Sequence, residues 1–194
     1  MSRQFPTPVG AGAIDLAAEN ALLRAALAEM GARAQELEHL ADTDGVTPLA
    51  NRRRFLRELE RVVGQCNRHG TPAAVLFIDL DGLKAINERH GYFAGDAALV
   101  HVAALLESLI RSTDLLARIG GDEFGLILDH LDHNSAIETA ERLARCIARS
   151  PLDLGHATVT VEASIGTATI LPGDTVEDVM LRGDRNLYIA KTEG

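Results

Sequence analysis

The chain has 194 residues, which is the size of one domain with a short additional segment. Hydrophobic residues make up 46% of the composition and charged residues 24%, so the chain can bury a sizeable core and is not a disordered tail. The 19 basic and 28 acidic residues give a net charge of −9, which excludes a protein that grips nucleic-acid backbones over a broad surface. We therefore expect no nucleic-acid partner, and any phosphate ligand must be bound by local groups.

The cysteines and the first residues of the chain bear on its compartment. Cys66 and Cys146 lack Cys-x-x-Cys spacing, which argues against a disulfide framework or a zinc site. The sequence does not open with a basic segment followed by an apolar run, and no stretch approaches about 18 uninterrupted apolar residues. We expect neither a signal peptide nor direct membrane insertion, and a cytoplasmic location.

The first 41 residues differ in pattern from the rest. Residues 1–12 are rich in Pro and Gly, and we interpret them as a flexible leader. Residues 13–41 predict an amphipathic helix with two heptad rows, which are Leu16, Leu23, Met30 and Leu37 at d, and Asn20, Leu27, Ala34 and Ala41 at a. A single Asn at an a position favours a parallel two-stranded coiled coil. The alternative is a helix that packs on its own domain.

The helical pattern breaks at Gly45 and Pro48, so residues 42–194 form the predicted main domain. Apolar patterns predict helices over 52–69 with Asn51 as N-cap, 83–90, 96–110, 135–149 and 176–191, and strands over 73–80, 115–119, 123–128 and 158–170 with an interruption at Gly166. The pair Gly120–Gly121 predicts a tight primed turn and an antiparallel hairpin. Together these elements predict an α+β fold, with a mainly antiparallel sheet flanked by helices and preceded by a long helix.

Acidic residues follow both a buried strand and the glycine pair. Asp79 and Leu80 end an apolar strand, while Asp122 and Glu123 come directly after Gly120–Gly121. Mg²⁺ binds through one or two carboxylates together with substrate phosphates, and glycine allows the backbone to approach a nucleotide closely. A strand end of this kind is by itself more often a solvated loop start or a helix cap. The hairpin makes a metal and phosphate site, with the Leu80 carbonyl as a further ligand, the better interpretation.

Four blocks of the sequence resemble the GGDEF domain family, whose members are diguanylate cyclases. The blocks are DGVTPLANRR at 44–53, DLDGLKAIN at 79–87, GGDEF at 120–124 and GDRNLYIAK at 183–191. They follow the family's order and spacing, and the resemblance covers about residues 41–191. It implies a nucleotidyl-cyclase palm-like fold with a ferredoxin-like core.

The resemblance implies a nucleotidyltransferase that condenses two GTP molecules into cyclic di-GMP and releases two pyrophosphates. A homodimer, joined through the N-terminal helix and the catalytic domains, would hold one GTP on each protomer. Two Mg²⁺ ions per active site, or Mn²⁺ in their place, would be bound by Asp79, the Leu80 carbonyl and Asp122. Asp122 would also accept the 3′-hydroxyl proton, and Glu123 would support the metal site.

The nucleotide contacts implied by the family fall on two neighbouring blocks. Asn87 and Asp96 would bind the guanine edge, which predicts GTP over ATP because Asp96 can accept the N1 and N2 protons that adenine does not offer there. The amides of Gly82 and Leu83 would hold phosphate oxygens. Tyr92 lies in the same pocket, where the family usually has His.

Two lysines complete the implied active site. Lys84 would stabilise charge that develops on the phosphates, and Lys191 would reach the β and γ phosphates. Without the resemblance to the family, a solvated surface lysine would be the better interpretation of both residues.

A second ligand site is implied just before the hairpin. Arg111 and Asp114 form the Arg-x-x-Asp motif at which cyclic di-GMP inhibits family members, and Arg142 lies where a further inhibitory arginine is expected. Guanidinium groups stack on guanine and bind phosphate with a fork of donors. Such a tetrapeptide also arises by chance as an exposed ion pair one helical turn apart.

Two other functions compete with the cyclase. The chain could be a catalytically quiet cyclic di-GMP receptor that uses Arg111, Asp114 and Arg142, or an interaction protein that acts through its N-terminal helix. The carboxylates of the glycine hairpin favour the cyclase, since neither alternative requires them. The sequence does not identify an input signal.

Overall fold

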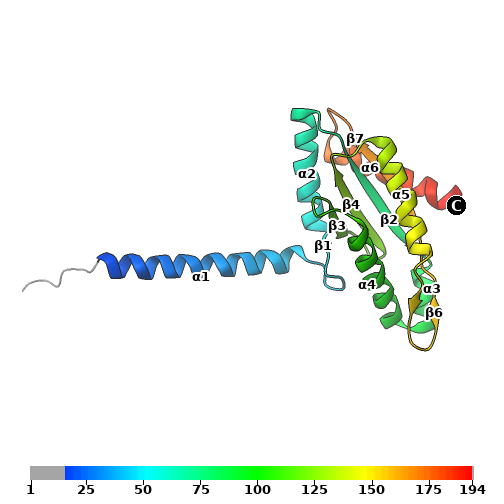
Figure 1. The fold of residues 1–194 in the computed structure, drawn as a ribbon, viewed down its shortest axis with the longest axis horizontal. Coiled ribbons are helices and arrows are strands. Elements are labelled where there is room, and N and C mark those ends of the chain that lie inside the picture. Colours follow the sequence, from blue (N-terminus) through cyan, green and yellow to red (C-terminus); the bar gives the residue numbers. More distant parts are fainter. Residues whose placement is uncertain (1–15, 194) are drawn as a thin grey trace, which may run out of the picture. The chain divides into compact units, whose positions relative to one another are not determined.

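The computed structural model describes residues 16–193 and divides the chain into two compact units, residues 1–41 and 42–194 (Figure 1). The predicted leader over residues 1–12 lies outside the described residues. Helix α1, Leu16–Asp42, is continuous over 27 residues. Its side chains Leu22, Leu23, Leu27 and Met30 are each 57–72% exposed. This is an apolar stripe without cover, and its pairing with a second helix stays a prediction.

The second unit is built on a five-stranded sheet of order β1-β3-β4-β2-β7. Its strands are β1 Ala50–Asn51, β2 Ala73–Asp81, β3 Leu115–Arg118, β4 Glu123–Asp129 and β7 Glu162–Ile170. Its helices are α2 Arg52–His69, α3 Leu83–His90, α4 Tyr92–Leu109, α5 His133–Ala148 and α6 Val176–Glu193. All strand pairs are antiparallel except β1 with β3. The predicted mainly antiparallel α+β fold is confirmed.

Helices cover both faces of this sheet (Figure 1). In β2, Leu76 and Ile78 pack in the core shared with α3, α4 and α5, whereas Val75 and Phe77 pack in the core shared with α2 and α6. Burial on both faces explains why β2 is an uninterrupted apolar run and not an alternating one. Helix α4 has the length and composition to cross a membrane, but its inward face, including Val102, is buried in this core.

Helix α2 begins and ends as its sequence predicts. The Asn51 side chain accepts a hydrogen bond from the Arg54 N–H at 3.1 Å, and Gly70 ends the helix in the left-handed conformation with φ of 65°. The buried stripe on its inner face includes Phe55 and Leu59. This stripe seats α2 against the sheet.

The structure corrects the predicted interruption at Gly166. This glycine lies inside β7, where it pairs with Phe77, and Phe77 also pairs with Gly125 of β4. Gly125 and Gly166 therefore lie on either side of Phe77 in the sheet. The Phe55 ring packs against Gly125, and the backbone of Leu187 packs against Gly166. The actual break falls after Val159, where β6 (Thr158–Val159) leaves to pair with β5 (Leu152–Asp153). That small hairpin has too few residues to give a periodic signal.

One predicted helix boundary and one predicted turn type also differ from the structure. Helix α4 begins at Tyr92 and not at residue 96, because Gly91, with φ of 87°, ends α3 and turns the chain directly into α4. Tyr92 and Phe93 are 83% and 92% exposed, so they add nothing to the apolar periodicity by which the start was predicted. The β3–β4 hairpin is antiparallel as expected, but neither Gly120 nor Gly121 has positive φ, so its turn is not a primed turn.

The close approach of α6 to β7 generates a stability prediction. A Cβ atom at Gly166 would collide with the backbone of Leu187 and the carbonyl of Gly183, neither of which can rotate away. We expect Gly166→Ala to lower the free energy of unfolding by about 1–3 kcal/mol, measured by urea denaturation. Gly45→Ala is the control, because no atom lies within 4 Å of its added methyl and its φ is not positive. Equal stability of the two variants would contradict this account of the packing.

Candidate active site

The pairing of β2 with β4 places the two acidic segments side by side. Asp79 lies opposite Glu123 in the register, and the Leu80 N–H donates to the Asp122 carbonyl at 3.0 Å. The Asp79 side chain points to the α6 face, is only 8% exposed, and accepts from Lys191 Nζ at 2.8 Å. Acidic groups far apart in the sequence therefore meet at one end of the sheet.

Burial and neighbouring charges set the protonation of this cluster. Burial, with the carboxylates of Asp122 and Asp81 nearby, raises the pKa of Asp79 although Lys191 opposes the shift. Burial on its own lowers the pKa of Lys191, but the hydrogen bond to Asp79 and the surrounding carboxylates outweigh it and raise that pKa. The ammonium of Lys191 thus compensates a buried carboxylate in the ligand-free protein.

The oxygen groups of this cluster suit a hard divalent cation. Asp79, Asp122 and the Leu80 carbonyl offer the ligand type that Mg²⁺ prefers, and a cation would relieve the repulsion that raises the pKa of Asp79. Among the described residues, no three acidic, His or Cys side chains gather as a metal-binding group. A metal would therefore need backbone and substrate oxygens as well as the carboxylates.

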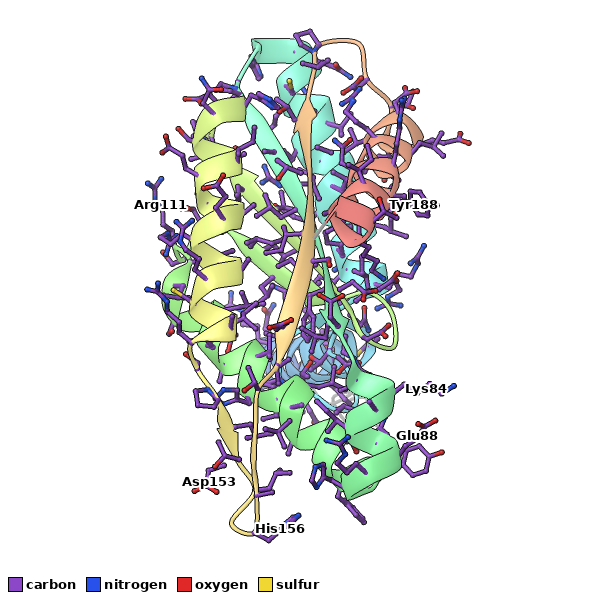
Figure 2. The ribbon with its side chains drawn as sticks, turned by 90° about the vertical axis from the view of Figure 1, so that its right-hand side faces the viewer. Lys84, Glu88, Arg111, Asp153, His156 and Tyr188 are labelled. Atoms are coloured by element: carbon purple, nitrogen blue, oxygen red, sulfur yellow. The ribbon has the colours of Figure 1, made fainter. Side chains whose placement is uncertain are left out.

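A hollow of about 500 Å³ lies beside the cluster, between α3, α4 and the glycine turn. Its lining residues are Leu83, Lys84, Asn87, Glu88, Tyr92, Gly95, Asp96, Leu99, Arg118, Gly121 and Asp122. The structure thus brings together six of the predicted site residues. Lys84 and Glu88 project outward from α3 (Figure 2). Lys84 is 90% exposed and lies 3.8 Å from Glu88, so its ammonium is not fixed by a strong contact.

The wall of the hollow contains an acceptor without a partner. Asn87 Oδ1 is buried and forms no hydrogen bond among the described residues. A side chain at Gly95 of α4 would collide with this amide, so the absence of a Cβ makes room for it. Buried polar atoms in folded proteins almost always have partners, so an orphaned one in a hollow indicates a ligand donor.

Two arginines that sequence reasoning left without a role hold the glycine turn. Arg118 donates through Nη2 to the Gly121 carbonyl at 2.7 Å, and through Nη1 to Asp44 at 3.1 Å. Arg52 donates to the Ile119 carbonyl at 3.2 Å. The position of Arg118 two residues before Gly120 is the one sequence signal for this. Both side chains fix the backbone from which Asp122 projects.

The remaining predicted residues lie around the same end of the sheet but outside this hollow. Gly82 is the N-cap of α3, with φ of 75° and no side-chain cap, so the first N–H groups of α3 remain available. Glu123 and Lys191 line a neighbouring hollow of about 280 Å³ between α2 and α6, together with Asp184 and Tyr188. In the ligand-free protein Lys191 contacts Asp79, and its predicted phosphate contact stays a prediction.

The predicted inhibitory residues also come together. Arg111, Asp114 and Arg142 line one small hollow of about 70 Å³, and Arg142 Nη2 donates to the Leu109 carbonyl at 3.4 Å. Asp114 accepts from the backbone N–H of Arg111 at 2.9 Å, so the motif is not a simple ion pair. Figure 2 shows Arg111 on the opposite side of the view from Lys84 and Glu88.

Comparison with known proteins identifies the family of the chain. The family model described as "Diguanylate cyclase, GGDEF domain" matches residues 41–194. Over 162 residues the chain is 38% identical to the bifunctional diguanylate cyclase/cyclic di-GMP phosphodiesterase MucR of Pseudomonas aeruginosa, covering 82% of this chain and 23% of MucR. Over 158 residues it is 37% identical to the response regulator PleD of Caulobacter vibrioides, covering 80% of this chain and 35% of PleD.

Solved structures match the fold over most of the chain. The crystal structure of the coiled coil and GGDEF domain of DgcB from Caulobacter crescentus, in complex with c-di-GMP, has a TM-score of 0.84 at 27% identity. The match covers 92% of this chain and 95% of that one. The chain spans about a quarter to a third of the length of the two curated relatives. The glycine turn, the acidic cluster beside it and these matches show that the chain belongs to the diguanylate cyclase GGDEF domain family.

Proposed function

We propose that the chain is a diguanylate cyclase that condenses two GTP molecules into cyclic di-GMP and two pyrophosphates. The observation that carries this proposal is the hollow in which the unpartnered Asn87 Oδ1 lies beside Asp96 and Asp122. A nucleotide bound in this hollow could place its base against Asn87 and Asp96 and its phosphates near the Asp122 carboxylate. The family model and the relative MucR, a bifunctional diguanylate cyclase/cyclic di-GMP phosphodiesterase, support the same activity.

Guanine is the base that fits the polar groups of the hollow. The Asn87 carbonyl oxygen needs a donor, and the Asp96 carboxylate can accept two. Guanine offers N1–H and N2–H₂ on one edge, whereas adenine has an acceptor at N1. Tyr92 is 83% exposed at the rim, so its replacement of the usual His changes the mouth of the hollow and not its floor.

The phosphates would extend from the base toward the acidic cluster. The uncapped start of α3 presents the N–H groups of Gly82 and Leu83, where the helix dipole also favours negative charge. Lys84 would stabilise the charge that develops on the phosphates, and Lys191 would reach the β and γ phosphates. Two Mg²⁺ ions, or Mn²⁺ in their place, would be held by Asp79, the Leu80 carbonyl and Asp122, with Glu123 in support.

The reaction is an in-line phosphoryl transfer. The 3′-oxygen of each GTP forms a bond to the α-phosphorus of the other, and the bond from that phosphorus to the bridging oxygen of pyrophosphate breaks. Asp122 would accept the 3′-hydroxyl proton, and the bound metals would neutralise the charge on the reacting oxygens. The positions of Arg118 and Arg52 on the turn would keep the Asp122 backbone fixed during this step.

The proposal requires two protomers, because the chain carries one such motif and the product contains two nucleotides. Two catalytic domains facing each other would each supply one GTP. Pairing of α1 through its exposed apolar stripe would raise their effective concentration. Product bound at Arg111, Asp114 and Arg142, away from the reacting groups, would inhibit the enzyme.

The first prediction concerns the product. The 194-residue chain, stripped of bound nucleotide and incubated with GTP and Mg²⁺, should form cyclic di-GMP and pyrophosphate, identified by chromatography and mass spectrometry. We expect Asp122→Ala to lower the rate at least about a hundredfold, because it removes a proton acceptor and a metal ligand. ATP should give no cyclic product.

A second measurement accompanies that experiment: calorimetry determines whether the wild-type protein binds added cyclic di-GMP. Cyclic di-GMP formed by the wild type and not by Asp122→Ala supports the cyclase. No product from the wild type, with tight binding of added cyclic di-GMP, would replace the cyclase by the receptor function.

The second prediction tests the guanine site. A methyl at position 95 must displace the Asn87 amide, which removes one contact to the base. We expect Gly95→Ala to raise the KM for GTP about tenfold, in line with the loss of one hydrogen bond to a buried group, with a smaller change in kcat. Gly45→Ala, where an added methyl meets no neighbour, is the control. An unchanged KM would remove Asn87 from base recognition.

The third prediction concerns α1. The unit over residues 42–194 contains both hydrophobic cores, so deletion of residues 1–40 should leave it folded. We expect the shortened protein to lose activity at micromolar concentration and to recover it at high concentration. Without α1, two catalytic domains would meet only by diffusion, so their pairing would depend on protein concentration. Activity that is the same at every concentration would remove the helix from the mechanism.

A further inference from the structure

Arg111 and Asp114 line two adjoining hollows, and sequence reasoning considered only one of them. The smaller, of about 70 Å³, faces α5 and Arg142. The larger, of about 430 Å³, faces the start of α2 and the segment before it, and its lining includes Arg54 and Pro48. A ligand with bases and phosphates is too large for the smaller hollow alone.

Arg54 stands out among the arginines at the start of α2. Its neighbour Arg53 pairs with Asp42 at 2.7 Å, and Arg52 donates to a carbonyl of the glycine turn. By contrast, within residues 16–193 neither the Arg54 guanidinium nor that of Arg111 takes part in a hydrogen bond or an ion pair. Two uncommitted cationic groups therefore face one hollow.

The other residues that line the larger hollow restrict the kinds of ligand that it could bind. Glu107 lies on the same rim and can accept N–H donors of a base, while Leu115 and Leu116 provide apolar contact for a ring. Two guanidinium groups fit a phosphodiester by forked hydrogen bonds and a purine by stacking on its face. The set matches a guanine nucleotide with phosphodiester charges, and no cation would be favoured between the two arginines.

We propose that Arg54 is a further binding residue for cyclic di-GMP, which occupies the larger hollow between Arg111 and Arg54. This inference rests on the inhibitory site of the proposed function and extends it from α5 to the start of α2. The bound product then contacts residues 48–50, in the segment that joins α1 to α2. Inhibition acts on that segment as well as on the helices around Arg142.

The test uses the full chain and measures inhibition of the cyclase by added cyclic di-GMP. We expect Arg54→Ala to raise the half-inhibitory concentration about tenfold, the effect of losing a charge-assisted hydrogen bond, while kcat and the KM for GTP stay unchanged. Arg54→Lys keeps the charge but loses the fork, and should lie between the alanine variant and the wild type. Calorimetry with cyclic di-GMP on the same variants should show the same order of affinity.

Two further variants separate the possible failures. Arg149→Ala removes an exposed arginine that lines neither hollow, and it should be inhibited like the wild type. If Arg111→Ala abolishes inhibition and Arg54→Ala behaves like Arg149→Ala, the inhibitory site stands and the role of Arg54 is refuted. If neither Arg111→Ala nor Arg54→Ala changes inhibition or binding, the inhibitory site itself is refuted together with the role of Arg54.

Discussion

The register between β2 and β4 is the constraint on which the rest of the site depends. It pairs Asp79 with Glu123 and brings the Leu80 N–H to the Asp122 carbonyl, so both acidic segments share one end of the sheet. A slip by one residue would turn Asp79 toward the other face of the sheet, away from Lys191. The same slip would move every core side chain of β2 to the wrong face. The packing of an apolar strand therefore fixes the position of a carboxylate.

Polar contacts then connect this strand end to the segment that follows α1. Arg118 bridges the Gly121 carbonyl and Asp44, while Asp44 also accepts from the backbone of Thr47 at 2.8 Å. Two residues earlier, the hydrogen bonds from Arg57 and Arg53 hold the pKa of Asp42 at about 2, so this carboxylate is charged throughout the physiological range. One side chain, Arg118, therefore links Asp44 to the backbone of the glycine turn. The start of the second unit and the glycine turn thus form one connected network.

Most of the elements could be predicted from the sequence because the spacing of apolar residues reflects which side chains are buried. Helix α2 is an example, since its bounds and its N-cap at Asn51 were both predicted. Sequence motifs likewise predicted one site for Asn87 and Asp122, and in the structure both residues line the same hollow. The predictions from the sequence failed where a contact with a residue distant in the chain determines the local conformation. Gly166 looks like a strand break until α6 is placed against it. The role of Arg118 depends on which carbonyl its side chain reaches, and no spacing rule contains that information.

The proposed function requires an acidic chain to bind a polyanion, and the local distribution of charge is compatible with this. The cations that face ligand sites are few and local, and each has a different state in the ligand-free protein: Lys84 is exposed, while Lys191 is bound to Asp79. Asp79 is buried, and burial together with the nearby carboxylates raises its pKa, so a neighbouring cation favours its charged form. In the proposed function, Lys191 would leave Asp79 to reach a phosphate, and a bound divalent cation would compensate the Asp79 carboxylate in its place. The proposed phosphate contact of Lys191 and the proposed metal ligation by Asp79 are therefore linked.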